Sequence, residues 1–317
     1  MIYINFSLDI EGVHGNEPFD QMVLGKCLNK DQDYGTLFLA SKFNNYNINS
    51  TFFIDTYSRL LHGNGKLINL ITNLKKYNQD VQLHTHPSWR VDKRDNSYVN
   101  SLKNKSFKNR HKDLMYKLNR EEQESFIFKE KNFLENMCGV SVDAHRSGGY
   151  AINDNTFHAL KSNSIFCDSS CYYGHYNTRR YLPLGFHNDI FEIPISFISV
   201  KKQLRRLDID YCSFSQIKSI LESLKYKKEN YFFTIFGHSY SLIDFDKNFN
   251  CFVPHKQKIV NFEKLLKYLS DNESFITTDK LSNFPKYYDQ SINNNLIPCA
   301  PAMPIFTRIL YCTRIHP

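Results

Sequence analysis

The sequence predicts an α/β fold in which parallel strands form a distorted (β/α) barrel wrapped by helices. Strand-like and helix-like segments alternate along the 317 residues, which is the pattern of a parallel sheet covered by helices. Short polar signatures also follow five of the strand-like segments, as functional residues do at the C-terminal face of an α/β barrel. These signatures are residues 9–12, 83–87, 145–150, 167–170 and 237–239.

The first half of the chain supplies alternating elements. Residues 2–8 alternate apolar and polar side chains, as a half-buried strand does. A helix is expected at 34–46, where apolar residues recur every three positions. Another is expected at 121–137, since acids crowd its first turn and Gly139 follows its end. The other elements expected here are strands at 51–54 and 81–83 and a helix at 67–74.

The second half continues the alternation. Residues 231–236 are strongly apolar, and Pro194 within the β-like segment 191–200 indicates an edge or a bulge, because proline lacks a ladder donor. Loops are expected at 89–119 and 171–188. The remaining elements are strands at 140–144, 164–167 and 275–277 and helices at 154–162, 214–224, 256–269 and from 279.

Neither an internal repeat nor a linker interrupts this pattern. We therefore expect one domain over residues 1–317, with its core at about 2–278. The extension 279–317 is expected to pack on the barrel. Its end is apolar and broken by prolines, which is also compatible with a peripheral membrane contact or a subunit contact.

The composition is that of a globular chain, with 41% apolar and 23% charged residues. The formal net charge is +8, and many of the Lys and Arg residues fall between 93 and 120. This stretch is either a solvated loop or a surface for an acidic partner, such as a nucleotide-sugar, a lipid pyrophosphate or an anionic membrane. A nucleic-acid partner is not expected, since no recognition motif accompanies the charge.

The eight cysteines contain no C-x-x-C pair, which argues against a zinc knuckle or a disulfide scaffold. The N-terminus reads as a strand rather than a signal peptide, and no stretch has the length and polarity of a transmembrane helix. We therefore expect a reduced cytoplasmic protein, with the inner membrane surface as a second expected location.

Acids and histidines at two strand ends predict a metal site. Asp9 and Glu11 are two residues apart, so in an extended strand their side chains point to the same side. Two carboxylates held close together favour a cation between them. His84 and His86 have the same spacing, and a carboxylate with two imidazoles leaves a position open for water, which is typical of catalytic zinc. Taken alone, either pair is also common as a structural feature.

Further strand ends carry residues suited to hydrolysis. We expect Arg146 to orient a carboxylate, with Asp9 as the candidate, and the glycines after it let backbone N–H groups approach an oxyanion. His238 is a candidate general acid, which Asp168 would orient. Trp89, the only tryptophan, would either stack on a sugar or simply pack.

Together these segments resemble the NodB-homology polysaccharide deacetylases, carbohydrate esterase family 4. The resemblance runs from residue 2 to about 278 and includes, in the family's order, SLDIEG, INSTFFID, VQLHTHPSW, DAHRSGGYAIN, FCDSS, FEIP and FGHS. The Leu-His-x-His-Pro form is most similar to uncharacterised deacetylases of lipopolysaccharide and O-antigen biosynthesis.

This resemblance implies a barrel with fewer than eight units, a divalent metal that is usually zinc, and N- or O-deacetylation of an acetylated sugar. The resemblance implies five side-chain roles and an oxyanion contact from a backbone N–H near Gly149. The side-chain roles are Asp9 as catalytic base, Glu11 and His84 as metal ligands, Arg146 as the group that orients the base, and His238 as general acid. Trp89, Gly149 and Tyr150 are the expected substrate contacts.

The sequence departs from the family's pattern at two positions. The second acid is Glu11, one residue further along than the usual aspartate. The second metal histidine usually lies four residues after the first, where this chain has Ser88, so His86 is expected to replace it from a different angle. Asp168 matches the family's fourth motif only loosely.

These expectations combine into a hydrolase of amide bonds. The expected activity is metal-dependent deacetylation of an N-acetylated sugar in surface-polysaccharide assembly, on a free, nucleotide-linked or lipid-linked substrate. Two alternatives stay open. One is hydrolysis of a small non-sugar amide on the same fold, and the other is a metal-free sugar-binding relative, which Ser88 motivates.

Overall fold

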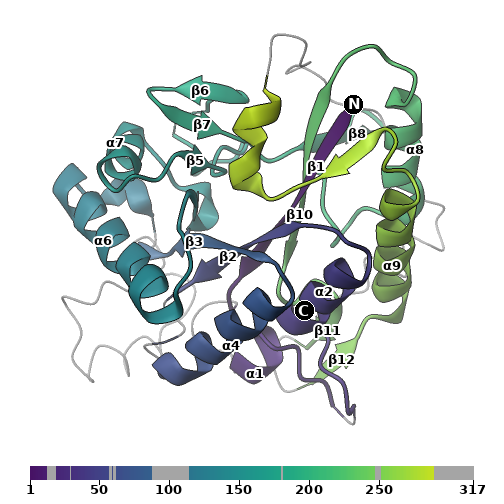
Figure 1. Ribbon diagram of the computed structural model, residues 1–317, viewed down its shortest axis with the longest axis horizontal. Helices are drawn as coiled ribbons and strands as arrows, with labels where there is room; N and C mark the ends of the chain where they lie inside the picture. Colours follow the sequence, from purple (N-terminus) through teal and green to yellow (C-terminus); the bar gives the residue numbers. More distant parts are fainter. Residues whose placement is uncertain are drawn as a thin grey trace.

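One curled sheet organises the molecule (Figure 1). The computed structural model describes residues 1–12, 19–28, 30–56, 59, 62–87, 114–179, 181–246 and 251–288. Within them, the strands of the main sheet are, in spatial order, β10 (Tyr231–His238), β1 (Ile2–Ile10), β2 (Ser50–Asp55), β3 (Asp80–Thr85), β4 (Ala144–Ser147), β5 (Cys167–Asp168), β7 (Ile190–Glu192) and β6 (Gly185–His187), and β13 (Ile276–Thr278) also pairs with β1.

The strand directions match the predicted barrel. Each neighbouring pair in this sheet is parallel except β6 with β7. The C-terminal ends of the parallel strands therefore gather along one rim, and the sheet curls into a half-barrel. This confirms the predicted distorted (β/α) barrel.

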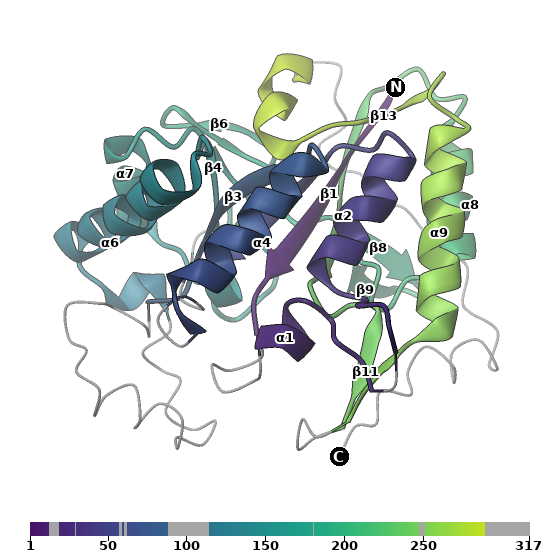
Figure 2. The same ribbon diagram turned by 60° about the horizontal axis from the view of Figure 1, so that its bottom comes forward.

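Helices cover the outer face of the sheet, and Figure 2 shows four of them, α6, α4, α2 and α9, in a row along it. The helices are α1 (Phe19–Met22), α2 (Thr36–Asn45), α4 (Asn64–Lys76), α6 (Arg120–Asn132), α7 (Asp154–Ser162), α8 (Phe214–Leu224) and α9 (Lys256–Ser270). Shorter helical turns are η4 (Met115–Lys117), η5 (Phe133–Met137), η6 (Gly148–Tyr150) and η7 (Leu281–Tyr287), and two hairpins join β8 (Phe197–Val200) to β9 (Gln203–Arg206) and β11 (Ile243–Phe245) to β12 (Phe252–Pro254).

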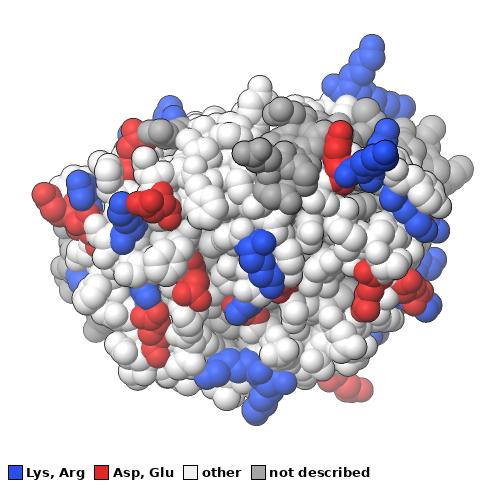
Figure 3. Space-filling model, turned by 45° about the horizontal axis from the view of Figure 1, so that its top comes forward, with Lys and Arg blue, Asp and Glu red and all other residues white. Residues whose placement is uncertain are grey.

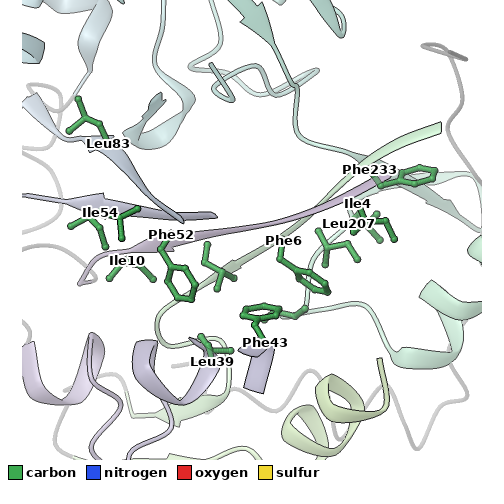
Figure 4. Close-up of a cluster of buried hydrophobic side chains, with 14 of the residues drawn as sticks. Ile4, Phe6, Ile10, Leu39, Phe43, Phe52, Ile54, Leu83, Leu207 and Phe233 are labelled. Atoms are coloured by element: carbon green, nitrogen blue, oxygen red, sulfur yellow. The ribbon is translucent and has the colours of Figure 1, made fainter. Parts of the chain in front are cut away.

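The two faces of β1 have different neighbours because successive side chains point to opposite sides of a strand. On the helix side, Phe6 packs 4.8 Å from the ring of Phe43 in α2, and Figure 4 shows both beside Phe52 of β2. On the inner side, Tyr3 stacks on Tyr287 of η7 at 4.5 Å. The segment after β13 thus fills the half-barrel at the N-terminal ends of the strands. The opposite rim, at the C-terminal ends of the strands, carries the polar residues of the predicted site.

Most expected helices and strands are present within a few residues of their predicted ends. The predicted helix at 121–137 begins one residue earlier, because the Asn119 side chain accepts from the backbone N–H of Glu122 in a capping box. The predicted strand at 140–144 is wrong in its position. Backbone N–H groups of Asp143 and Ala144 donate to the side chain of Gln82 instead of a neighbouring strand, so β4 begins only at Ala144.

Other differences follow from turns that periodicity does not show. The predicted loop at 171–188 contains β6, and the segment 191–200 is divided at Pro194 into β7 and β8. The hairpin of β11 and β12 was not predicted. The expected loop at 89–119 lies outside the described residues up to 113, as does the chain after 288.

In the described part of the chain, no helix combines the length and apolar character needed to cross a membrane. The six cysteines found there all carry free thiols.

Candidate active site

The ends of β1 and β3 bring Glu11, His84 and His86 together. Glu11 Oε2 lies 3.0 Å from His84 Nε2 and 2.5 Å from His86 Nε2, and the two imidazole nitrogens are 3.1 Å apart. Among the described residues these three form a group whose donor atoms all lie within 4.8 Å of one another. Carboxylate oxygen and imidazole nitrogen suit zinc and related divalent ions, so this donor set fits a metal ion.

His84 is held in the orientation that a metal ligand needs. Its Nδ1 lies 2.9 Å from the backbone oxygen of Arg146, and a carbonyl oxygen only accepts, so Nδ1 donates. In the neutral ring, Nε2 therefore carries the lone pair, and it faces Glu11. Metal-binding histidines are commonly fixed in this way by a hydrogen bond from the second nitrogen.

The charges of these groups depend on one another. Burial by itself raises the pKa of Glu11, but His86 and His84 outweigh burial and hold that pKa well below its usual range. Burial lowers the pKa of His84, but the carboxylates of Asp9 and Glu11 outweigh it and raise that pKa. The site therefore holds an ionised carboxylate and attracts positive charge, which either protons or a divalent ion supply.

Asp9 is oriented by Arg146 at the end of β4, as the sequence predicted. Arg146 Nη1 donates to Asp9 Oδ1 at 2.8 Å, while its Nε and Nη2 donate to the backbone oxygen and Oγ of Ser169 at 3.0 and 2.8 Å. The guanidinium group is fully buried, so this geometry is rigid. Asp9 Oδ2 lies 3.8 Å from His84 Nε2, so the oxygen that Arg146 does not hold is near the metal donors.

His238 approaches the same donors from β10, because β1 and β10 pair Asp9 with His238 in register. Its Nε2 lies 3.9 Å from Glu11 Oε1, and its Nδ1 lies 3.3 Å from Asp210 Oδ2. The ring stacks on Tyr240 at 4.8 Å. A carboxylate at Nδ1 orients the imidazole and leaves Nε2 directed to the site, which suits a general acid.

The carboxylate beside His238 is not the one that the sequence analysis chose. Asp168 is fully buried and lies 2.7 Å from His145 Nδ1. Because β4 and β5 pair His145 with Asp168 in register, these two side chains meet each other. The prediction that Asp168 orients His238 was therefore wrong, and Asp210 has that place.

Asp210 is the site residue that the sequence analysis missed. It ends the segment Leu-Asp-Ile-Asp at 207–210, directly after β9. This is the same pattern as Asp9 and Glu11, two acids at alternate positions near a strand end, so a signal was present. It was not recognised because β9 itself, with the sequence QLRR, does not have the apolar pattern of a strand.

The predicted substrate contacts differ in their surroundings. Gly149 has a φ of +59°, a left-handed conformation that suits glycine, and its carbonyl accepts from Asn177 Nδ2 at 3.1 Å. Tyr150 is buried, and its hydroxyl accepts from Arg206 Nη1 at 2.7 Å. Trp89 lies outside the described residues.

The surface charge of the described residues does not indicate a particular class of binding partner. On the face that Figure 3 shows, Lys and Arg side chains are interspersed with Asp and Glu rather than gathered into one field. Most of the basic stretch between 93 and 120 lies outside the described residues, and so does Ser88.

Comparison with known proteins shows that this chain shares its fold with solved structures. No family model and no curated protein matches the chain. Among solved structures, the chain is similar to a protein from Mycobacterium smegmatis described as a polysaccharide deacetylase, at 13% sequence identity and a TM-score of 0.55, with 96% of this chain and 94% of that chain covered.

Two other solved structures share the architecture. A 4-alpha-glucanotransferase from Thermococcus litoralis matches at 11% identity and a TM-score of 0.58, covering 95% of this chain and 41% of that one. Puue allantoinase matches at 12% identity and a TM-score of 0.53, covering 90% of this chain and 89% of that one. These names span three activities, so the shared fold establishes the architecture and the site must carry the chemistry.

Proposed function

We propose that this protein is a metal-dependent hydrolase that removes the acetyl group from an N-acetylated sugar. The observation that carries the proposal is the convergence, at one strand rim, of a metal-donor group, an oriented carboxylate and an oriented imidazole. These are Glu11 with His84 and His86, Asp9 held by Arg146, and His238 held by Asp210. The fold shared with the M. smegmatis protein supports the same class of reaction.

Each residue has a place in the hydrolysis. A divalent ion held by the three donors supplies Lewis acidity when bound, which activates water and polarises an acetyl carbonyl. Asp9 accepts the proton of the attacking water at Oδ2, because Oδ1 is engaged by Arg146. A backbone N–H of the turn at Gly149 donates to the oxygen on which negative charge develops.

The second half of the reaction protonates the leaving nitrogen, and the proton that Asp9 accepted then passes to His238, so that both groups return to their starting states. As the water oxygen bonds to the acetyl carbon, the amide C–N bond breaks, and His238 gives a proton from Nε2 to the departing nitrogen. Asp210 keeps the ring in place during this transfer. The products are acetate and a free amino sugar. An acid poised for the leaving atom favours an amide, since an amine leaves poorly without protonation.

We further propose zinc as the metal, because two imidazoles and one carboxylate are a common catalytic zinc set. The Leu-His-x-His-Pro resemblance supports a role in lipopolysaccharide or O-antigen assembly, on a nucleotide- or lipid-linked sugar. In that role the protein acts in the cytoplasm, at the inner membrane surface.

Hydrolysis of a small non-sugar amide is the second candidate. The structural similarity to an allantoinase favours it, and the same residues would perform it. The two candidates differ in what the pocket accepts around the scissile bond, and substrate tests separate them.

The deciding experiment combines metal content with acetate release. Wild-type protein should hold about one zinc ion per chain by elemental analysis, as expected for a site with three protein ligands, and release acetate from N-acetylated sugars. An Asp9→Asn variant should keep the metal and lose acetate release. Turnover of small amides alone would favour the second candidate. Protein that binds no metal, even after reconstitution, would overturn both and favour a sugar-binding relative.

A further inference from the structure

Gly148 lies against the imidazole of His86 so closely that no side chain fits between them. A Cβ atom added at Gly148 would lie 2.3 Å from His86 Cε1, 2.5 Å from Nδ1 and 2.6 Å from Nε2. Non-bonded carbon atoms pack at about 3.5–4.0 Å, so the ring and a Cβ atom exclude each other. His86 occupies the space that the missing side chain leaves.

The backbone at Gly148 does not itself require glycine. Gly149 and Tyr150 have positive φ values of +59° and +57°, whereas Gly148 is not among the positive-φ residues. An alanine at 148 therefore meets no conformational penalty of the kind expected at 149. Space for the imidazole is what the glycine provides.

His86 needs that space because of its position in the chain. It follows the last residue of β3, and its ring lies 4.7 Å from the ring of His84 at an interplanar angle of 87°. In this position its Nε2 lies 2.5 Å from Glu11 Oε2, and Gly148 of η6 lies against the ring. Gly148 on one side and His84 on the other thus fix the imidazole.

We propose that Gly148 is a positioning residue for the metal ligand His86, and that the two form a matched pair in this chain. The inference rests on the proposed metal site. A side chain at 148 shifts the His86 ring within the donor group, whereas Glu11 and His84 keep their places, so one of the three protein ligands of the proposed metal is disturbed rather than lost.

The test compares two adjacent glycines. Gly148→Ala should weaken Zn²⁺ binding by about 10- to 100-fold in a competition titration with a chromophoric chelator, the usual effect of disturbing a metal site through a neighbouring residue. Gly149→Ala, although strained by its positive φ, should leave Zn²⁺ affinity within a few-fold. In protein loaded with Co²⁺, the visible absorption should change in Gly148→Ala and stay unchanged in Gly149→Ala.

A double-mutant cycle separates positioning from general damage. In a His86→Ala background, Gly148→Ala should have no further effect on Zn²⁺ affinity, because the displaced ring is already absent. Equal affinities for wild type and Gly148→Ala would overturn this inference and leave the proposed function standing. A wild-type protein without any affinity for divalent metal would overturn both.

A second inference rests on a row of aromatic rings that begins at His238. The ring of Phe236 lies 4.8 Å from His238 and 6.3 Å from Tyr150. Tyr150 contacts His175 at 5.1 Å, and His175 stacks on Tyr176 at 4.5 Å. Tyr176 is 80% exposed, so the row passes from the candidate general acid to an open ring.

The loop that carries the outer rings is anchored to the candidate active site. Asn177 Nδ2 donates to the carbonyl of Gly149, and Thr178 Oγ1 donates to the carbonyl of Tyr150 at 3.3 Å. Burial and the nearby Arg206 lower the pKa of His175, which keeps its ring neutral at pH 7. One face of Tyr176 thus rests on a fixed, uncharged support, and the other is open.

An open, supported aromatic face suits a sugar ring. The face of an aromatic ring is negative, and the C–H face of a pyranose is apolar and slightly positive. We propose that His175 and Tyr176 form a stacking platform for a second sugar beside the acetylated one, so that a glycan of at least two sugars is a better substrate than a single sugar. This deepens the proposed function by naming a substrate class.

The test uses an N-acetylhexosamine and its tetramer. Tyr176→Ala should lower kcat/KM for the tetramer by about 3- to 10-fold, the range of one aromatic contact, and leave the monosaccharide unchanged. Tyr226→Ala is the matched control, since Tyr226 is 86% exposed and lies between α8 and β10. Calorimetric titration of the tetramer into metal-loaded Asp9→Asn protein gives a readout that is independent of turnover.

The outcomes are distinguishable. Equal effects of Tyr176→Ala on both sugars, or no effect on either, would overturn the platform while deacetylation stands. If wild-type protein releases no acetate, the proposed function fails, and the titration still decides on the platform. Tetramer binding that Tyr176→Ala leaves unchanged counts against it.

Discussion

Adjacent residues of β3 and β4 enter two clusters of different character. His84 and Arg146 contact Glu11 and Asp9 at the rim, whereas their neighbours turn to the other side of the sheet. There Thr85 Oγ1 lies 2.8 Å from His145 Nε2, and His145 Nδ1 lies 2.7 Å from Asp168 Oδ1. At the rim, we call Glu11, His84 and His86 together the metal cluster. On the other side, we call Thr85, His145 and Asp168 together the buried network.

Both clusters contain histidine and a carboxylate, but the groups are paired differently. In the buried network each group finds a complement: Asp168 accepts from His145, which accepts at its other nitrogen from the hydroxyl of Thr85. In the metal cluster the carboxylate of Glu11 and two imidazole nitrogens converge on one point. The positive charge that this group attracts is supplied either by protons on the imidazoles or by a divalent ion. Histidine and carboxylate side chains therefore indicate a ligand site when their electron-pair donors converge on one point, and a structural role when each is paired with a complementary group.

The largest difference should appear on removal of a histidine from the metal cluster. His84→Ala should lower Zn²⁺ affinity by at least about 100-fold and abolish turnover, because a ligand is lost rather than disturbed. Elemental analysis and acetate release measure both effects. A variant that keeps its metal and full activity would remove the distinction between the clusters.

In the buried network, the matching change should act on stability. His145→Ala removes the imidazole that donates to the buried Asp168, while the backbone N–H and the hydroxyl of Ser170 still donate to this carboxylate. The loss of one buried hydrogen bond to a charged group should lower the free energy of unfolding by about 1–3 kcal/mol. Urea denaturation measures this loss. The folded fraction should bind Zn²⁺ as tightly as the wild type does, and weaker binding would place His145 in the functional site.

The two aspartates provide a smaller contrast. Asp210→Asn should lower kcat by about 10- to 100-fold, part of the 10²–10⁴ that a positioned acid contributes. Asp168→Asn should leave kcat of the folded protein within about two-fold and lower the free energy of unfolding, because a buried charged hydrogen bond is replaced by a neutral one. Parallel measurements of kcat and urea denaturation decide, and exchanged results would restore the prediction that Asp168 orients His238.

The smallest effect concerns pH. Glu192 is paired with Asp168 in register, and burial together with that carboxylate raises the pKa of Glu192 well above its usual value of 4.5. A raised folded-state pKa contributes stability that is complete below the unfolded pKa, near 4.5, and is lost as the pH rises toward the folded value.

Glu192→Gln, which mimics the protonated acid, should therefore flatten the dependence of stability on pH. Each unit of pKa difference corresponds to about 1.4 kcal/mol. Urea denaturation between about pH 5 and 8 should show the wild type losing stability relative to the variant as the pH rises. Parallel curves for the two proteins would show that Glu192 is ionised in the folded state.

The sequence was sufficient for the barrel because its signals are local and repeated. Strand and helix periodicities follow from which side chains face the core, and Asn119 marks the start of α6 through its capping box. It was insufficient for short elements such as β6 and β9, whose 3 and 4 residues are too few to show a periodicity. The start of β4 also differs from the prediction, because the side chain of Gln82 accepts from the backbone N–H groups of Asp143 and Ala144 there.

The sequence by itself determined the donors of the site and their pairwise spacing. Residues two apart in a strand share a side, so Asp9 with Glu11 and His84 with His86 follow from local geometry. Only the tertiary structure decided which groups from different strands meet.

The register of the sheet places His238 beside Asp9 and Arg146 beside His84, and the segment after β9 brings Asp210 to His238 from 28 residues away. The tertiary structure also decided that Asp168 belongs to the buried network and that His86 occupies the space beside Gly148. Periodicity reports which face a residue is on. Strand order and register, which depend on contacts far apart in the chain, decide what lies opposite it.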